Sequence, residues 1–178
     1  MKSKDQILLE EAYQIIIEQN SHIDRRNKIE IFSDGKGSDL ADKYQGPTKK
    51  VFIKDVLPNE PFKDTSYMKT SENIKKMIQS INKGEKLPPI KVIHHPYDSN
   101  KYVIVDGNHR AYAFSKSNIK EVDAILIPPK DVILMKSEYG ENKQELGTLD
   151  KFINDRKVVD KYFVKPDGTN IFPKPNEI

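Results

Sequence analysis

The most informative segment of this chain is Tyr102-Val-Ile-Val-Asp-Gly-Asn-His-Arg-Ala-Tyr-Ala113. Its apolar first half predicts a buried strand, Asp106-Gly107 predicts a turn, and the residues from Asn108 onward predict a helix. A helix that begins at such a turn presents backbone N–H groups without partners inside the helix. These groups and the helix dipole attract anions, and Arg110 adds a forked, permanently charged donor. The segment therefore predicts a phosphate cradle. The alternative is an ordinary turn in which Gly107 supplies an unusual backbone angle and Arg110 pairs with an internal carboxylate.

Strand and helix signals around this segment predict an α+β domain over residues 49–130. The helix signal is strongest between Thr70 or Ser71, as the cap, and Gly84, because apolar residues recur there at helical spacing. A turn at residues 97–100 is expected to join two strands in a hairpin. The expected fold class is a small mixed sheet with flanking helices. The predicted strands are Lys28–Phe32, Lys50–Leu57, Ile90–Ile93, Tyr102–Val105 and Val122–Ile127.

Two extensions flank this predicted core. Residues 1–48 are expected to form an N-terminal helical and β extension, with an amphipathic helix over residues 7–20 and a polar linker that ends at Gly46-Pro47. Residues 131–178 are expected to form a C-terminal helical extension and a tail. The basis for the C-terminal helix is four apolar residues on one helical face: Leu146, Leu149, Phe152 and Ile153.

Composition narrows the classes of function. The chain has 178 residues and a formal charge of +3, so it is long enough for one core domain and lacks the strong positive charge of most nucleic-acid binders. It has no cysteine, which excludes disulfides, thiolate metal sites and cysteine nucleophiles. Acidic residues interrupt the N-terminus and no window reaches membrane-spanning length, so we expect a cytoplasmic protein with no membrane partner, or a fragment of a secreted effector. His94 and His95 are adjacent on a strand and point to opposite faces, so no metal site is predicted.

Two segments carry a family resemblance, Leu87-Pro-Pro-Ile-Lys-Val92 and Val105-Asp-Gly-Asn-His-Arg-Ala-Tyr-Ala113. They resemble the proline–isoleucine strand and the D-G-x-H-R helix start of the ParB/sulfiredoxin-like superfamily. The resemblance covers residues 50–128 and implies a ParB/sulfiredoxin-like core with N- and C-terminal helical extensions. It also implies a nucleotide cofactor, ATP or CTP, together with Mg²⁺.

Three branches of this superfamily imply three chemistries. Sulfiredoxins carry a cysteine between the glycine and histidine of the motif, but this chain has Asn108 there, so their thiol chemistry is excluded. Chromosome-partitioning ParB proteins bind CTP with a motif that usually has two adjacent arginines, and a helix-turn-helix domain follows. Here His109 precedes a single arginine, and residues 131–178 show no convincing helix-turn-helix, so a full partition clamp is not expected.

The third branch contains ParB-like free-serine kinases, in which an early carboxylate acts as base toward a hydroxyl. Glu60 stands at a comparable place, directly after a predicted strand. Those enzymes tend to carry histidine where this chain has Asn108, which leaves the substrate open. The resemblance thus favours an enzyme, a phosphotransferase or nucleotide hydrolase. Its substrate is ATP or a related nucleotide, and its acceptor is water or a small hydroxylated molecule such as serine.

The expected roles follow from these resemblances and from the residue types. Glu60, Asp106 and His109 are the candidate catalytic residues. Gly107, Asn108, His109 and Arg110 are the candidate nucleotide-binding residues. Each also has a structural alternative: Glu60 on a solvated loop, Asp106 paired with Arg110, and His109 as a buried hydrogen-bonding residue.

Nearby tyrosines also bear on nucleotide binding. Tyr97, Tyr102 and Tyr112 are candidates for stacking on a base, and core packing is the alternative for Tyr112.

Two other functions stay open at this point. One is a DNA-associated or regulatory module that uses CTP or ATP as a switch, and the other is a nuclease or nucleotide-hydrolysing toxin domain. A homodimer is compatible with any of these.

Overall fold

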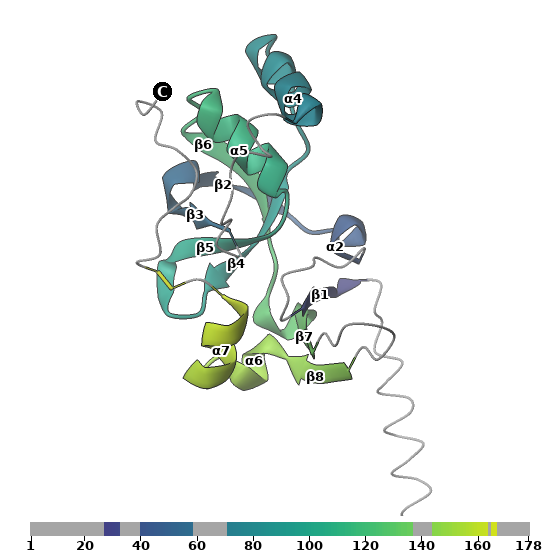
Figure 1. Ribbon diagram of the computed structural model, residues 1–178, viewed down its shortest axis with the longest axis vertical. Helices are drawn as coiled ribbons and strands as arrows, with labels where there is room; N and C mark the ends of the chain where they lie inside the picture. Colours follow the sequence, from purple (N-terminus) through teal and green to yellow (C-terminus); the bar gives the residue numbers. More distant parts are fainter. Residues whose placement is uncertain (1–26, 33–39, 59–70, 137–143, 164, 167–178) are drawn as a thin grey trace, which may run out of the picture.

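The computed structural model describes residues 27–32, 40–58, 71–136, 144–163 and 165–166. Within them the chain forms a five-stranded sheet, a three-stranded sheet and helices that cover both (Figure 1). The expected α+β class is confirmed. The helix predicted over residues 7–20 and the candidate base Glu60 lie outside the described residues. None of the described helices is long and apolar enough to cross a bilayer.

The five-stranded sheet has the order β2-β6-β4-β5-β3. β4 and β5 form the antiparallel hairpin that the sequence predicts, and β6 lies parallel to β4. The predicted strands at residues 90–93, 102–105 and 122–127 are therefore confirmed. The strand bounds are β2 Thr48–Phe52, β3 Val56–Leu57, β4 Ile90–His95, β5 Asp98–Asp106 and β6 Glu121–Leu126.

The single strand predicted at Lys50–Leu57 is wrong. A short 3₁₀ helix, η2 (Ile53–Asp55), separates β2 from β3, and these two strands form opposite edges of the sheet. Three residues of 3₁₀ helix span only about 6 Å, so the two edges lie close together and the sheet is strongly curled. The sequence marks this break only by the charged pair Lys54-Asp55, and the apolar residues on both sides of the pair favour a single strand.

Both faces of the five-stranded sheet are buried, which explains the nearly continuous apolar runs of its central strands. On β5, Ile104 joins the core under the helices α4 (Glu72–Asn82) and α5 (Asn108–Lys116). Its neighbours Val103 and Val105 join the opposite core. The predicted helix from Ser71 to Gly84 is confirmed as α4, and Gly84 adopts a positive φ of 80° just after its end.

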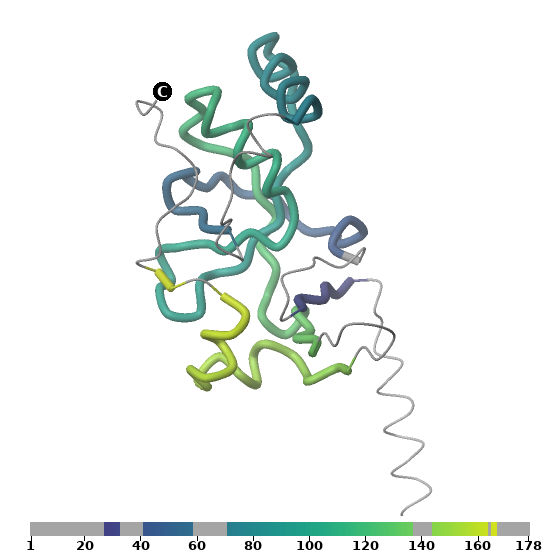
Figure 2. Tube along the Cα trace, in the orientation of Figure 1, coloured from purple at the N-terminus to yellow at the C-terminus, as the bar shows by residue number. Residues whose placement is uncertain are grey.

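A three-stranded sheet of order β1-β7-β8 covers the second face, and Figures 1 and 2 show it at the opposite end of the molecule from α4 and α5. The predicted strand at residues 28–32 is confirmed as β1, which pairs with β7 in parallel. Residues 131–178 contain the helices α6 and α7 but also the strands β7 and β8, and Leu146, which is expected on a helical face, lies in β8. β7 has its partner β1 about a hundred residues earlier, so local spacing does not reveal the pairing. The bounds are β1 Ile29–Phe32, β7 Val132–Lys136, β8 Gln144–Thr148, α6 Leu149–Phe152 and α7 Arg156–Tyr162.

The segment predicted as a linker contains structure. A one-turn helix, α2 (Leu40–Lys43), lies in it, and Ala41 and Tyr44 are buried in the core. The hydroxyl of Tyr44 donates to Asp131 Oδ2 at 3.0 Å. Asp131 ends the short 3₁₀ helix η3 (Pro129–Asp131), so this bond ties the segment before β2 to the segment before β7.

Tyr44 makes the free energy of unfolding depend on pH in the alkaline range. Burial and then the hydrogen bond to Asp131 raise the pKa of Tyr44 from 10.0 to about 12. Between about pH 10 and pH 12 the unfolded chain loses this proton while the folded protein keeps it, so the free energy of unfolding falls as pH rises. Between about pH 9 and about pH 12 we expect the free energy of unfolding to fall by about 2–3 kcal/mol less in Tyr44→Phe than in the wild type. Urea unfolding at about pH 9 and about pH 12 measures this, and equal falls in both proteins would contradict it.

Candidate anion-binding site

The predicted strand, turn and helix at residues 102–113 are confirmed. β5 ends at Asp106, Gly107 follows in a left-handed conformation with φ 104° and ψ 25°, and α5 begins at Asn108. The first hydrogen bond of this helix runs from the Ala111 N–H to the Gly107 carbonyl at 2.9 Å. The amides of residues 108–110 come before that bond, and a helix offers them no carbonyl of its own.

Gly107 is required at the turn for two reasons. Its φ lies in a region that side chains with a Cβ rarely adopt. A Cβ there would also lie 2.9 Å from Ile90 Cγ2 and 3.0 Å from both Nε and Nη2 of Arg110. The missing side chain therefore leaves the space in which the guanidinium group lies against the turn.

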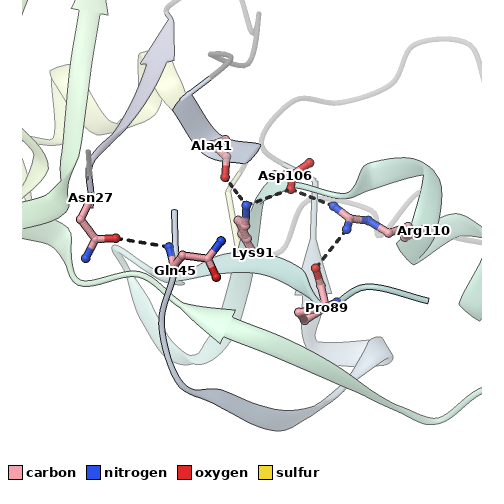
Figure 3. A network of polar contacts seen from close by, with 7 residues as sticks. All are labelled: Asn27, Ala41, Gln45, Pro89, Lys91, Asp106 and Arg110. Atoms are coloured by element: carbon pink, nitrogen blue, oxygen red, sulfur yellow. Dashed lines mark hydrogen bonds and ion pairs between the residues drawn. The ribbon is translucent and has the colours of Figure 1, made fainter. Parts of the chain in front are cut away.

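Arg110 is held by two bonds inside the protein. Its Nη2 donates to Asp106 Oδ2 at 2.8 Å and its Nη1 donates to the Pro89 carbonyl at 3.1 Å (Figure 3). A cation in the first turn of a helix opposes the helix dipole, and the Asp106 carboxylate offsets this. The arrangement agrees with the alternative in which Asp106 is the partner of Arg110. It also fixes the guanidinium beside the amides of the first turn.

Lys91 is a second cation at the site, and sequence reasoning missed it. Its Nζ lies 3.8 Å from Asp106 Oδ2 and also donates to the Ala41 carbonyl in α2 (Figure 3). The only signal was a lysine within the apolar run from Ile90 to Ile93. Lys91, Arg110 and Asp106 together carry a net charge of +1, which favours an anion.

A β-bulge brings Lys91 and Asp106 together. Val92 lies opposite Ile104 across the hairpin, but Lys91 lies opposite Asp106, so Val105 is the extra residue. Because side chains alternate along a strand, this extra residue turns Asp106 to the side of Lys91.

Asn108 and His109 complete the first turn of α5. The Oδ1 atom of Asn108 is buried and has no hydrogen-bond partner in the described part of the chain. Most buried polar atoms have a partner, so this atom is suited to a donor from water or a ligand. His109 is half-buried at the same turn.

The tyrosines considered for stacking lie in three different places. Tyr112 is 2% exposed and belongs to the core under α5. Tyr102 packs beside His94, with ring centroids 5.0 Å apart, and Lys49 lies over its ring. Tyr97 lines a cavity with Arg156 of α7. Within the described ranges, no three His, Asp or Glu side chains converge as a metal site.

Two buried tyrosine hydroxyls, of Tyr112 on α5 and of Tyr162 on α7, allow a paired test of buried hydrogen bonding. The Tyr112 hydroxyl has no partner among the described residues, whereas the Tyr162 hydroxyl donates to the Met135 carbonyl at 3.1 Å. We expect Tyr112→Phe to raise the free energy of unfolding by up to about 1 kcal/mol and Tyr162→Phe to lower it by about 1 kcal/mol. Urea unfolding measures both free energies. A larger loss of stability in Tyr112→Phe than in Tyr162→Phe would contradict the assignment of a hydrogen-bond partner to the Tyr162 hydroxyl and none, among the described residues, to that of Tyr112.

These features define a class of protein, an α+β domain with a positively charged cluster at a strand–glycine–helix turn. The model of the ParB N-terminal domain family matches residues 41–143, more than half of the chain, and the chain belongs to this family. The resemblance to the ParB/sulfiredoxin-like superfamily is therefore confirmed. No curated protein sequence matches the chain.

Solved structures of three related kinds resemble this fold. The C-terminally truncated chromosome-partitioning protein ParB from Caulobacter crescentus, complexed with CTP-gamma-S, is 23% identical, with 46% of this chain and 44% of that chain covered and a TM-score of 0.39. A free serine kinase in complex with AMP is 18% identical, with coverages of 47% and 32% and a TM-score of 0.38. Sulfiredoxin from Arabidopsis thaliana is 19% identical, with coverages of 46% and 84% and a TM-score of 0.33. The match spans less than half the length of the ParB and kinase chains, and at these identities it concerns the fold alone.

Proposed function

We propose that this protein binds a nucleotide and holds its phosphates at the N-terminus of α5. The observation that carries the proposal is the net positive cluster of Lys91, Asp106 and Arg110 at the turn where α5 begins. A phosphate there would meet backbone donors, the positive end of the helix dipole and a fixed guanidinium group. The nucleotides to test are ATP and CTP, which the resemblance of the motif implies.

The proposed reaction is transfer of a phosphoryl group to water or to a small hydroxyl such as that of serine. The bond between the terminal phosphorus and its bridging oxygen breaks, the nucleoside diphosphate leaves, and the acceptor oxygen bonds to phosphorus. The acceptor proton passes to a base, for which Glu60 is the predicted residue. Arg110 and the amides would neutralise phosphate charge, and His109 would donate a hydrogen bond to a phosphate oxygen.

The described residues do not form a Mg²⁺ site of their own. The Oδ2 atom of Asp106 already accepts from Arg110 and faces Lys91. Mg²⁺ bound with a nucleotide keeps several waters and is held largely by the phosphates. We therefore assign no step to protein-bound Mg²⁺.

Turnover of labelled ATP and CTP, with and without serine, tests the proposal. We expect phosphate release or phosphoserine formation, with loss of product in Glu60→Gln and full product in the control Glu121→Gln, an exposed glutamate at the start of β6. Binding without turnover would contradict the transfer step, and salt-sensitive DNA binding in that case would favour the regulatory module. A protein that binds neither nucleotide would contradict the whole proposal.

A further inference from the structure

Lys91 is buried to an unusual degree for a lysine, with its side chain only 8% exposed. A buried ammonium group is costly unless it is paired and hydrogen-bonded. Within the described ranges its partners are the Asp106 carboxylate and the Ala41 carbonyl. Lys91 thus connects the candidate anion site to helix α2, two parts of the chain that are far apart in sequence (Figure 3).

Arg110 and Lys91 both face the Oδ2 atom of Asp106, but at different distances. Arg110 Nη2 is at hydrogen-bond distance, 2.8 Å, while Lys91 Nζ is at 3.8 Å. An anion that bonds to Arg110 competes with Asp106 for the guanidinium donors. A relative movement of about 1 Å would then bring Lys91 to charge-assisted hydrogen-bond distance from Asp106.

We propose that Lys91 is a positioning residue that holds Asp106 when an anion engages Arg110, and that it passes this change to α2. The inference rests on the function proposed above. An ammonium group has three donors, so Lys91 can bond to Asp106 without releasing the Ala41 carbonyl. The Ala41 carbonyl accepts from Tyr44 N–H at 3.3 Å as well as from Lys91, so a movement of the ammonium group changes the hydrogen bonding at the buried end of α2.

The test compares three lysine variants by calorimetric titration with ATP and CTP. We expect Lys91→Met to bind about 10-fold more weakly and Lys91→Arg to stay within about 3-fold of the wild type. The matched control is Lys101→Met, because Lys101 also forms an ion pair on this sheet, with Asp55 at 2.9 Å, but lies outside the cluster. Its affinity is expected to be unchanged.

Two further readouts separate positioning from simple charge attraction. If Lys91 acts through Asp106, the loss in Lys91→Met disappears in an Asp106→Asn background. Addition of nucleotide should also shift the backbone amide NMR signals of Ala41–Lys43 in the wild type and not in Lys91→Met. Where Lys91→Met does not fold, Lys91→Gln replaces it, because its amide retains a donor for Ala41.

The outcomes distinguish the two proposals. A wild type that binds no nucleotide overturns the proposed function and this inference with it. If the wild type binds, equal affinity in Lys91→Met overturns the inference alone. So does a loss that persists in the Asp106→Asn background, or an α2 that does not respond to nucleotide.

Discussion

Gly107→Ala is expected to lower the free energy of unfolding by about 3 kcal/mol and to abolish measurable nucleotide binding. The φ of 104° places the alanine in a strained conformation, which costs about 1–3 kcal/mol. The new Cβ would also lie 2.9 Å from Ile90 and 3.0 Å from the guanidinium of Arg110, which adds about 1–3 kcal/mol of overpacking. The side chain of Arg110 has to move away to relieve this contact. The variant therefore loses the anion site as well as stability.

Gly84→Ala is the control for this prediction. Gly84 has a φ of 80°, but a Cβ there would meet nothing within 4 Å. We expect this variant to lose only about 1 kcal/mol from backbone strain and to bind nucleotide normally. Urea unfolding and calorimetry of both variants measure the difference. A Gly107→Ala protein no less stable than Gly84→Ala would refute the packing argument.

Arg110→Ala is expected to weaken binding of ATP, ADP and CTP by about 10- to 100-fold. The reason is the loss of a charged hydrogen-bond donor worth about 1.5–3 kcal/mol at the phosphate. Arg110→Lys should recover only part of this, because an ammonium group cannot form the forked bond. Titration of each variant with the three nucleotides measures the effect.

Arg156→Ala provides the arginine control. Arg156 lies on α7, where its guanidinium stacks over the ring of Tyr97 at 5.2 Å, outside the anion site. Its removal should leave nucleotide affinity unchanged. Equal affinities of Arg110→Ala and the wild type for all three nucleotides would show that Arg110 only completes the internal pair with Asp106.

Much of the fold could be predicted because its determinants are local. The helix α4 has an apolar stripe and a terminal glycine, and the hairpin of β4 and β5 follows directly from a proline-led strand and a turn. The pairing of β1 with β7 could not be predicted. The two strands are about a hundred residues apart, and the sequence of one strand does not indicate which strand pairs with it. The change of sheet edge between β2 and β3 could not be predicted either, because apolar residues on both sides of the charged pair Lys54-Asp55 favour a single strand.

The candidate site was predicted in part for a similar reason. Gly107, Asn108, His109 and Arg110 are consecutive, so one turn of chain places them together. Lys91 joins them only through hairpin register and a bulge at Val105, which no local spacing shows. The partner of Arg110 could be anticipated as an internal carboxylate, because Asp106 lies four residues away across the turn.

The most direct test of phosphate binding at the α5 N-terminus is an amide NMR titration of the ¹⁵N-labelled protein with ATP and CTP. We predict that the largest shifts occur at the backbone amides of Gly107, Asn108, His109 and Arg110, because these residues form the turn and the N-terminus of α5. Inorganic phosphate should shift the same signals at higher concentration. Unchanged signals at these four residues, or largest shifts at the cavity lined by Tyr97 and Arg156, would contradict the proposed site.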